Sequence, residues 1–228
     1  MPARPRLVVM VKDPRPGRVK TRLATDIGAI PATWWMRHQL RDLLRRLRDP
    51  RWDLVLAVAP DGAVASPVFP HDLARVAQGP GDLGDRMGRV LRNRASNVQR
   101  AAPGPRGGAI APALGGGSGA ARRSRRVEQT SWAVPCCIIG ADIPGITRTH
   151  IARAFQALRG SDAVFGPAPD GGYWLIGMRG VRPPPPGLFQ GVRWSTEHAL
   201  SDTLATLPRH RITLVNTLRD VDTAADLP

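Results

Sequence analysis

Short apolar runs alternate along the chain with longer segments in which apolar residues recur at helical spacing. Four of these runs are predicted to be buried strands, at residues 6–11, 53–60, 73–78 and 133–140. Helical segments follow, one that begins near Pro31 and continues to about Arg48 and another from about Thr147 to Leu158. Strands that alternate with helices predict an α/β fold in which helices cover both faces of a largely parallel sheet.

The last third of the chain predicts two further strands joined by a turn, and then a helix. Two apolar runs within residues 162–178 flank a turn at residues 170–172. Ser195 or Thr196 is the expected cap of the helix that follows, whose first turn contains Glu197 and His198. The chain closes with a strand and with a short helix that is entered through an acidic turn.

The length of the chain and one break in its pattern define the expected domain organisation. A chain of 228 residues fits one α/β domain, so we expect a single domain over residues 1–228. Between about residues 96 and 132 the periodicity gives way to Gly, Pro, Ala and Arg. Such a composition cannot bury an apolar face, which predicts a flexible insertion that acts either as a lid or as a tolerated surface loop.

The charge of the chain suits a partner that carries phosphate. The formal net charge is +15 and the isoelectric point is about 11.6, as in proteins that bind nucleic acid, acidic membranes or phosphorylated small molecules. Much of the excess is arginine within residues 36–51 and 121–126. A solvated arginine face is the favoured explanation of these two clusters.

Two further features bear on where the protein acts. No apolar run reaches the roughly 20 residues that span a bilayer, and the apolar stretch near the N-terminus is too short for a signal peptide. We therefore expect a cytoplasmic protein. The two cysteines, Cys136 and Cys137, are adjacent within an apolar run, which predicts small buried strand residues and no disulfide.

The loop after the first predicted strand, "VKDPRPGRVKTRLA" at residues 11–24, raises the possibility of a phosphate-binding loop. It is not a P-loop, because Val19 precedes the lysine and Asp13 stands where the first glycine is required. A strand end, a turn and a short helix that Thr21 is expected to cap nevertheless suit an anion. Its four cations either grip a phosphate or belong to a solvated basic turn: Lys12, Arg18, Lys20 and Arg22.

Carboxylates follow two of the predicted strands. Asp142 comes at the end of the most apolar strand, and Asp220 and Asp222 follow the last one. Because one or two carboxylates together with nucleotide phosphates commonly hold Mg²⁺, these residues are candidate metal ligands. Each also has a simpler interpretation as a helix cap.

The turn "PDGG" is the remaining candidate. Asp170 precedes Gly171 and Gly172, which allow close approach of the backbone to a ligand, although a plain hairpin turn has the same residues. All four constellations follow predicted strands, at the edge where ligands of open α/β sheets bind. Together they predict a nucleotide-diphosphate site.

Six motifs in this order resemble the bacterial DUF2064 proteins, a group placed with glycosyltransferases in the nucleotide-diphospho-sugar transferase superfamily and in part associated with arsenosugar biosynthesis. The motifs are "VKDPRPGRVKTRLA", "QGPGDLGDRM", "IIGADIPGIT", "GPAPDGGYWLIGM", "WST" and "DVDTAADL". The resemblance covers the whole chain except the insertion. It implies a GT-A-like, Rossmann-like α/β/α sandwich that binds a nucleotide with Mg²⁺ or Mn²⁺. More distantly, the motifs resemble nucleotidyltransferases.

The resemblance also implies a role for each candidate residue. The diphosphate would be contacted by Lys12, Arg18, Lys20 and Arg22. The nucleobase and ribose would be framed by Gln78 and by the backbone at Gly79, Gly81 and Gly84. The metal site would consist of Asp142 with Asp222 or Asp220. The sugar or acceptor would face Asp170, Gly171, Gly172 and Tyr173.

The leading hypothesis is a metal-dependent glycosyltransferase that moves a sugar from a nucleotide sugar to a small-molecule acceptor. The metal and the basic loop would neutralise the leaving nucleoside diphosphate, and Asp170 would act as general base. One alternative is a nucleotidyltransferase that acts on a nucleoside triphosphate. Another is a basic nucleic-acid-binding protein, which is less favoured because the aromatic residues are few and are not interleaved with the cations.

Overall fold

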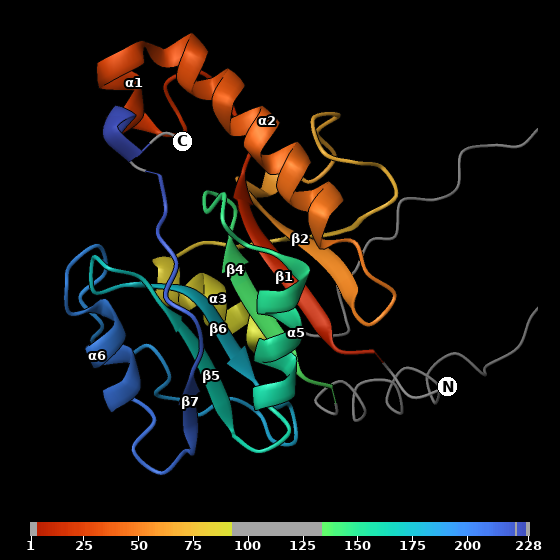
Figure 1. Ribbon diagram of the computed structural model, residues 1–228, viewed down its shortest axis with the longest axis vertical. Coiled ribbons are helices and arrows are strands. Elements are labelled where there is room, and N and C mark those ends of the chain that lie inside the picture. The colour runs from red at the N-terminus through yellow and green to blue at the C-terminus, as the bar shows by residue number, and fades with distance from the viewer. Residues whose placement is uncertain (1–3, 93–133, 222, 227–228) are drawn as a thin grey trace, which may run out of the picture.

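The computed structural model describes residues 4–92, 134–221 and 223–226. Within these residues, all strands join one seven-stranded sheet in the order β3-β2-β1-β4-β6-β5-β7 (Figure 1). Only β6 runs antiparallel to its neighbours among the described strands, so the predicted α/β fold with a mostly parallel sheet is confirmed. The strands are β1 (Arg6–Lys12), β2 (Asp53–Ala59), β3 (Ala74–Ala77), β4 (Cys136–Gly140), β5 (Ala163–Pro167), β6 (Tyr173–Met178) and β7 (Ile212–Leu214).

Helices cover both faces of the sheet, as the resemblance implied. Alternate residues of β1 divide between two cores: Leu7 and Val9 pack with α2 and α5, whereas Val8 packs with α3 and α6. This alternation follows from the two-residue period of a strand. The helices are α1 (Thr21–Ile27), α2 (Ala29–Leu47), α3 (Leu83–Arg92), α5 (Arg148–Ala157) and α6 (Ala199–Ala205), with short 3₁₀ turns η1 (Asp61–Ala63) and η2 (Ala224–Asp226).

Two helix starts differ from the sequence prediction. Thr21 is the first residue of α1 and not its cap, because the N-cap position belongs to Lys20, whose backbone is left-handed with φ of 48°. The helix predicted from Ser195 or Thr196 begins only at Ala199. Local side-chain bonds that compete with the helix explain the second difference, as shown below.

Other expectations can be compared with the structure directly. Cys136 and Cys137 are both buried within β4, as predicted, and neither forms a disulfide. The predicted insertion at 96–132 lies outside the described residues. In the part of the chain that the structure describes, no helix is both long enough and apolar enough to cross a membrane.

Candidate functional site

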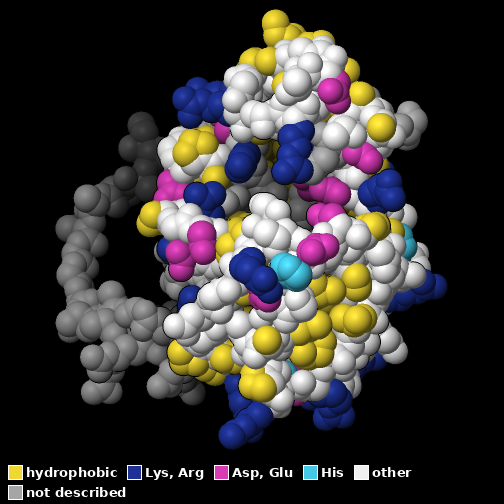
Figure 2. Space-filling view, turned by 90° about the vertical axis from the view of Figure 1, so that its left-hand side faces the viewer, with side chains coloured by type: hydrophobic (Ala, Val, Ile, Leu, Met, Phe, Trp, Pro, Cys, Tyr) yellow, Lys and Arg dark blue, Asp and Glu magenta, His cyan; other side chains and the backbone are white. Residues whose placement is uncertain are grey.

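The sheet brings the predicted loops to a single edge. Because β1, β2, β3, β4 and β5 are parallel, the loops that follow them leave at their shared carboxyl ends, and β6 starts at that same edge. Figure 2 shows the surface of the molecule hollowed on this side, with lysine or arginine side chains on one rim and acidic side chains beside them. Ligands of open α/β sheets bind at such an edge.

The loop after β1 is anchored by Asp13. This buried carboxylate accepts hydrogen bonds from Arg15 Nε at 2.7 Å and from Ser66 Oγ at 3.1 Å, and its backbone N–H donates to the carbonyl of Ala59 at 2.8 Å. The residue that stands where a P-loop has its first glycine thus ties the loop to the end of β2. The loop is held by side-chain bonds and not by a glycine-rich cradle.

The four basic residues of this loop fall into two groups. Lys12, Arg18 and Arg22 are exposed, whereas the side chain of Lys20 is only 7% exposed. Lys20 Nζ donates to Asp142 Oδ2 at 2.8 Å and to the backbone carbonyl of Val221 at 2.5 Å. Lys20 therefore joins the basic loop, the end of β4 and the C-terminal segment, and the exposed group presents positive charge to solvent.

Asp142 lies at the carboxyl end of β4 with its side chain 36% exposed. Thr147 caps α5 and its hydroxyl accepts from the backbone N–H of His150, so the interpretation of Asp142 as the cap of this helix is wrong. The Val221 N–H donates to the carbonyl of Asp142 at 3.3 Å, which brings the segment that carries Asp220 alongside. Asp222 lies outside the described residues.

The donors at this edge suit a divalent ion that takes only one or two protein ligands. Across residues 4–92, 134–221 and 223–226, no three His, Cys, Asp or Glu side chains gather as a metal-binding group. Mg²⁺, however, keeps several waters and takes one or two carboxylates with substrate phosphates. A partly exposed Asp142 beside the Asp220 segment fits that mode of binding.

Gln78 and Gly79 form the start of the turn after β3. The side chain of Gln78 is buried, and its Nε2 donates to the carbonyls of Val11 at 3.0 Å and Ala57 at 2.8 Å. The Gly79 N–H donates to Asp61 Oδ1 at 2.9 Å. The amide nitrogen of Gln78 therefore ties together the ends of β1 and β2, and the backbone of the turn remains the part that can frame a ligand.

The glycines of this turn have different structural roles. Gly79 and Gly81 adopt positive φ angles of 77° and 96°, which give the turn its shape. Gly84 instead permits close packing of α3, since a Cβ there would lie 2.7 Å from Phe189 Cβ and 2.9 Å from Trp194 Cζ2. Trp194 belongs to the "WST" motif, so this contact joins two of the motifs found in the sequence.

The turn between β5 and β6 is closed by its own aspartate. Asp170 Oδ1 accepts from the Gly172 N–H at 2.9 Å, and the Ala168 N–H donates to the Gly172 carbonyl at 3.0 Å. Gly171 has a φ of 82° and allows another group to approach its backbone closely. The group that does so is the carbonyl oxygen of Glu197, which lies 2.1 Å from the position that a Cβ on residue 171 would take. The turn is thus a hairpin turn, as one of the two interpretations predicted. Its exposed residues lie at the edge of the sheet where the parallel strands end.

Tyr173 begins β6 and faces α6. Its hydroxyl is 3.3 Å from Thr203 Oγ1, and its ring makes edge contacts with Phe165 and Trp194. Burial raises the pKa of the Tyr173 phenol, so it stays protonated at neutral pH. Tyr173 holds α6 against the sheet.

One protein family resembles the central and later part of the chain. The model of DUF2064, described as an uncharacterized protein conserved in bacteria, matches residues 108–196, a span that contains Asp142, the Asp170 turn and the "WST" motif. This part of the chain is similar to the DUF2064 family. No curated protein matches the chain.

Solved structures support the same fold. A protein from Desulfovibrio desulfuricans G20, provisionally named a nucleotide-diphospho-sugar transferase, is 25% identical with a TM-score of 0.71 and covers 97% of this chain and 83% of its own. Two more distant structures share the fold alone. Rv0371c from Mycobacterium tuberculosis H37Rv is 14% identical with a TM-score of 0.50, and the match covers 98% of this chain and 96% of Rv0371c. The 4-diphosphocytidyl-2C-methyl-D-erythritol synthase from Anaerococcus prevotii is 8% identical with a TM-score of 0.50, and the match covers 97% of this chain and 94% of the synthase. The chain thus has the fold of nucleotide-diphospho-sugar transferases.

Proposed function

We propose that this protein is a metal-dependent glycosyltransferase that transfers a sugar from a nucleotide sugar to a small-molecule acceptor. The observation that carries the proposal is the contact between the basic loop and the end of β4, where Lys20 Nζ lies 2.8 Å from Asp142 Oδ2. It joins a cationic loop to a carboxylate at the ligand edge of the sheet. A diphosphate with a bound divalent ion needs both kinds of group side by side.

The exposed cations of the loop bind the diphosphate. Lys12, Arg18 and Arg22 extend from the loop and from the start of α1, where positive charge stabilises the negative charge that builds up on a leaving nucleoside diphosphate. Lys20 has a different role, because its bonds to Asp142 and Val221 fix the loop relative to the metal site. The turn after β3, from Gln78 to Gly84, frames the nucleobase and ribose through its backbone.

Asp142, with Asp220 or Asp222, would hold Mg²⁺ or Mn²⁺. When bound, such an ion supplies charge neutralisation to the diphosphate of the leaving group. Asp142 also positions Lys20, so a single carboxylate organises both the metal site and the basic loop. The rim formed by Asp170, Gly171 and Gly172 would face the sugar or acceptor, and Asp170 is the base predicted from sequence.

A nucleotidyltransferase acting at the same edge is the second candidate. The fold shared with a synthase that is named for a diphosphocytidyl product favours it. In that reaction an acceptor oxygen would attack the α-phosphate of a nucleoside triphosphate and pyrophosphate would leave. The same cations would then stabilise a different leaving group.

Analysis of the reaction products separates the two reactions. The purified protein is incubated with Mn²⁺ and glycerol, together with UDP-glucose, UDP-N-acetylglucosamine or GDP-mannose, or with each nucleoside triphosphate. The proposal predicts release of UDP or GDP from a nucleotide sugar, detected by ion-exchange chromatography. Release of pyrophosphate from a triphosphate, with all three nucleotide sugars left intact, would contradict it in favour of nucleotidyl transfer.

A further inference from the structure

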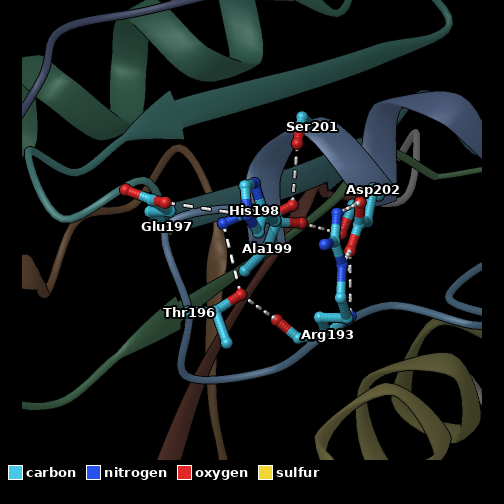
Figure 3. Close-up of polar contacts among 8 residues, drawn as sticks. Arg193, Thr196, Glu197, His198, Ala199, Ser201 and Asp202 are labelled. Carbon is cyan, nitrogen blue, oxygen red and sulfur yellow. Dashed lines mark hydrogen bonds and ion pairs between the residues drawn. The ribbon is translucent and has the colours of Figure 1, made fainter.

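The segment between Arg193 and Asp202, which contains the "WST" motif, is closed by a clamp of hydrogen bonds between these two residues. The Asp202 carboxylate accepts from the Arg193 backbone N–H at 3.1 Å, from Nε at 2.9 Å and from Nη2 at 2.9 Å (Figure 3). Ser195, inside the clamp, has a left-handed backbone with φ of 60°. Strained non-glycine residues of this kind cluster at functional sites.

Side-chain hydrogen bonds fix the backbone on both sides of His198. Thr196 Oγ1 donates to the Arg193 carbonyl at 2.8 Å and accepts from the His198 N–H at 3.2 Å, and Ser201 Oγ donates to the His198 carbonyl at 2.9 Å. These contacts delay the start of α6 to Ala199. They hold His198 in place without involving its ring.

The clamped segment presents two polar side chains to solvent. Glu197 is 80% exposed and His198 is 45% exposed, and Figure 3 shows the carboxylate directed at the ring, with Glu197 Oε1 3.6 Å from His198 Nε2. A carboxylate at this distance stabilises the protonated form of an imidazole. The imidazole of such a pair can act as a general base, and the carboxylate can stabilise the imidazolium that results.

Two contacts connect this pair, through the β5–β6 turn, to the edge of the sheet that carries the proposed metal site. β4 and β6 are antiparallel, and Ile139 of β4 lies opposite Leu175 of β6. The end of β4, which leads to Asp142, and the start of β6, which follows the β5–β6 turn, therefore lie at the same edge of the sheet. That turn touches the clamped segment, since the Leu200 N–H donates to the Gly171 carbonyl at 3.0 Å and Gly171 lies against the backbone of Glu197. The β5–β6 turn thus links β6, the neighbour of β4, to the clamped segment.

We propose that His198 is the general base of the transfer reaction and that Glu197 stabilises its protonated form. This inference rests on the proposed function. In a direct displacement, the acceptor O–H gives its proton to Nδ1 of His198 and the acceptor oxygen bonds to the anomeric carbon. The bond from that carbon to the diphosphate breaks, and its electron pair leaves with the nucleoside diphosphate. The imidazolium that forms faces Glu197.

His198 suits this role better than Asp170. One oxygen of Asp170 closes its own turn by accepting from the Gly172 N–H. An imidazole has an ordinary pKa of about 6.5 and can exchange protons near neutral pH, whereas an ordinary carboxylate with a pKa of about 3.9 is a weak base. The charged groups of the segment that carries His198 are Glu197, Arg193 and Asp202, and the turn that packs on Glu197 carries Asp170.

The test compares turnover with nucleotide binding in four variants. The probe is whichever of the three nucleotide sugars gives nucleoside diphosphate release with glycerol and Mn²⁺. The variants are His198→Ala, Glu197→Gln, Asp170→Asn and, as a matched control, His38→Ala on α2. We expect His198→Ala to lower kcat by about 10²- to 10⁴-fold with the Kd for UDP or GDP unchanged. Glu197→Gln should cause a smaller loss and His38→Ala none.

Two further readouts distinguish a base from a structural residue. Added imidazole should restore part of the turnover of His198→Ala, and the fall of kcat toward acid pH that a general base predicts for the wild type should be absent from that variant. Wild-type turnover in His198→Ala, or loss of the acid limb in Asp170→Asn instead, would overturn the inference while the proposed function stands. Failure of the wild type to cleave any nucleotide sugar would overturn the proposed function itself, and this inference with it.

Discussion

At the scale of single residues, Gly171 and Lys20 each contact a group from a distant part of the chain. Gly171 was predicted to allow close approach of a ligand, and the group that approaches is the backbone of Glu197. Lys20 was predicted to bind phosphate, and its ammonium group is bonded to Asp142, 122 residues away. Partners so distant in sequence are set by the packing of the whole sheet, which residue spacing does not reveal.

The crowding at Gly171 leads to a stability prediction with an internal control. Gly171 and Gly17 have similar φ angles of 82° and 74°, but a Cβ at Gly17 would meet nothing within 4 Å. Gly17→Ala should therefore cost only the left-handed strain of about 1–2 kcal/mol. Gly171→Ala must also displace the Glu197 backbone, and we expect a loss of about 3 kcal/mol or more in the free energy of unfolding. Urea denaturation measures both, and equal losses would contradict the proposed contact.

At the scale of elements, strands were predicted more accurately than helix starts. The apolar runs fix β1, β2 and β4 because each strand is buried on both faces and needs a continuous run of apolar residues. The start of α6 was misplaced because Thr196, a typical cap residue, instead bonds to the Arg193 carbonyl. Such a local competition depends on geometry that a capping pattern alone does not contain.

The clamp at the entrance to α6 should make stability depend on acid. The hydrogen bonds from the Arg193 side chain, and then from its backbone N–H, lower the pKa of Asp202 to about 2. A carboxylate whose pKa is lower in the folded state stabilises the fold above its ordinary pKa of about 3.9 and loses that contribution as the pH falls through its folded value. The wild type should thus melt at a higher temperature than Asp202→Asn from neutral pH down to about pH 4.

Thermal melts of both proteins between pH 7 and pH 2 measure this difference. The gap in Tm should narrow progressively between about pH 4 and pH 2 as Asp202 is protonated. A gap that stays constant over this range would show that the charge of Asp202 contributes nothing. High salt should reduce the gap at pH 7, because the Arg193 side chain is 58% exposed.

At the scale of the whole molecule, the sequence predicted the edge on which the site lies more securely than the arrangement of the strands. Ligands of open α/β sheets bind at the carboxyl ends of the parallel strands. This rule placed the basic loop and Asp142 at one edge of the sheet, and it does not require the strand order to be known. The order itself, with β6 inserted between β4 and β5, depends on tertiary packing. So does the return of the C-terminal segment to the end of β4, which places Asp220 near Asp142.

The central claim is that this edge binds a nucleoside diphosphate together with a divalent ion held by Asp142. Isothermal titration calorimetry of UDP and GDP with and without Mn²⁺ tests it in the wild type, in Asp142→Asn, which keeps an oxygen for Lys20, and in Asp53→Asn. Asp53 is the matched control, because it is an exposed aspartate at the opposite end of the strands. We predict that Mn²⁺ strengthens nucleotide binding in the wild type and in Asp53→Asn, and that Asp142→Asn loses this dependence. Unchanged Mn²⁺ dependence in Asp142→Asn, or no nucleotide binding by the wild type, would contradict the account.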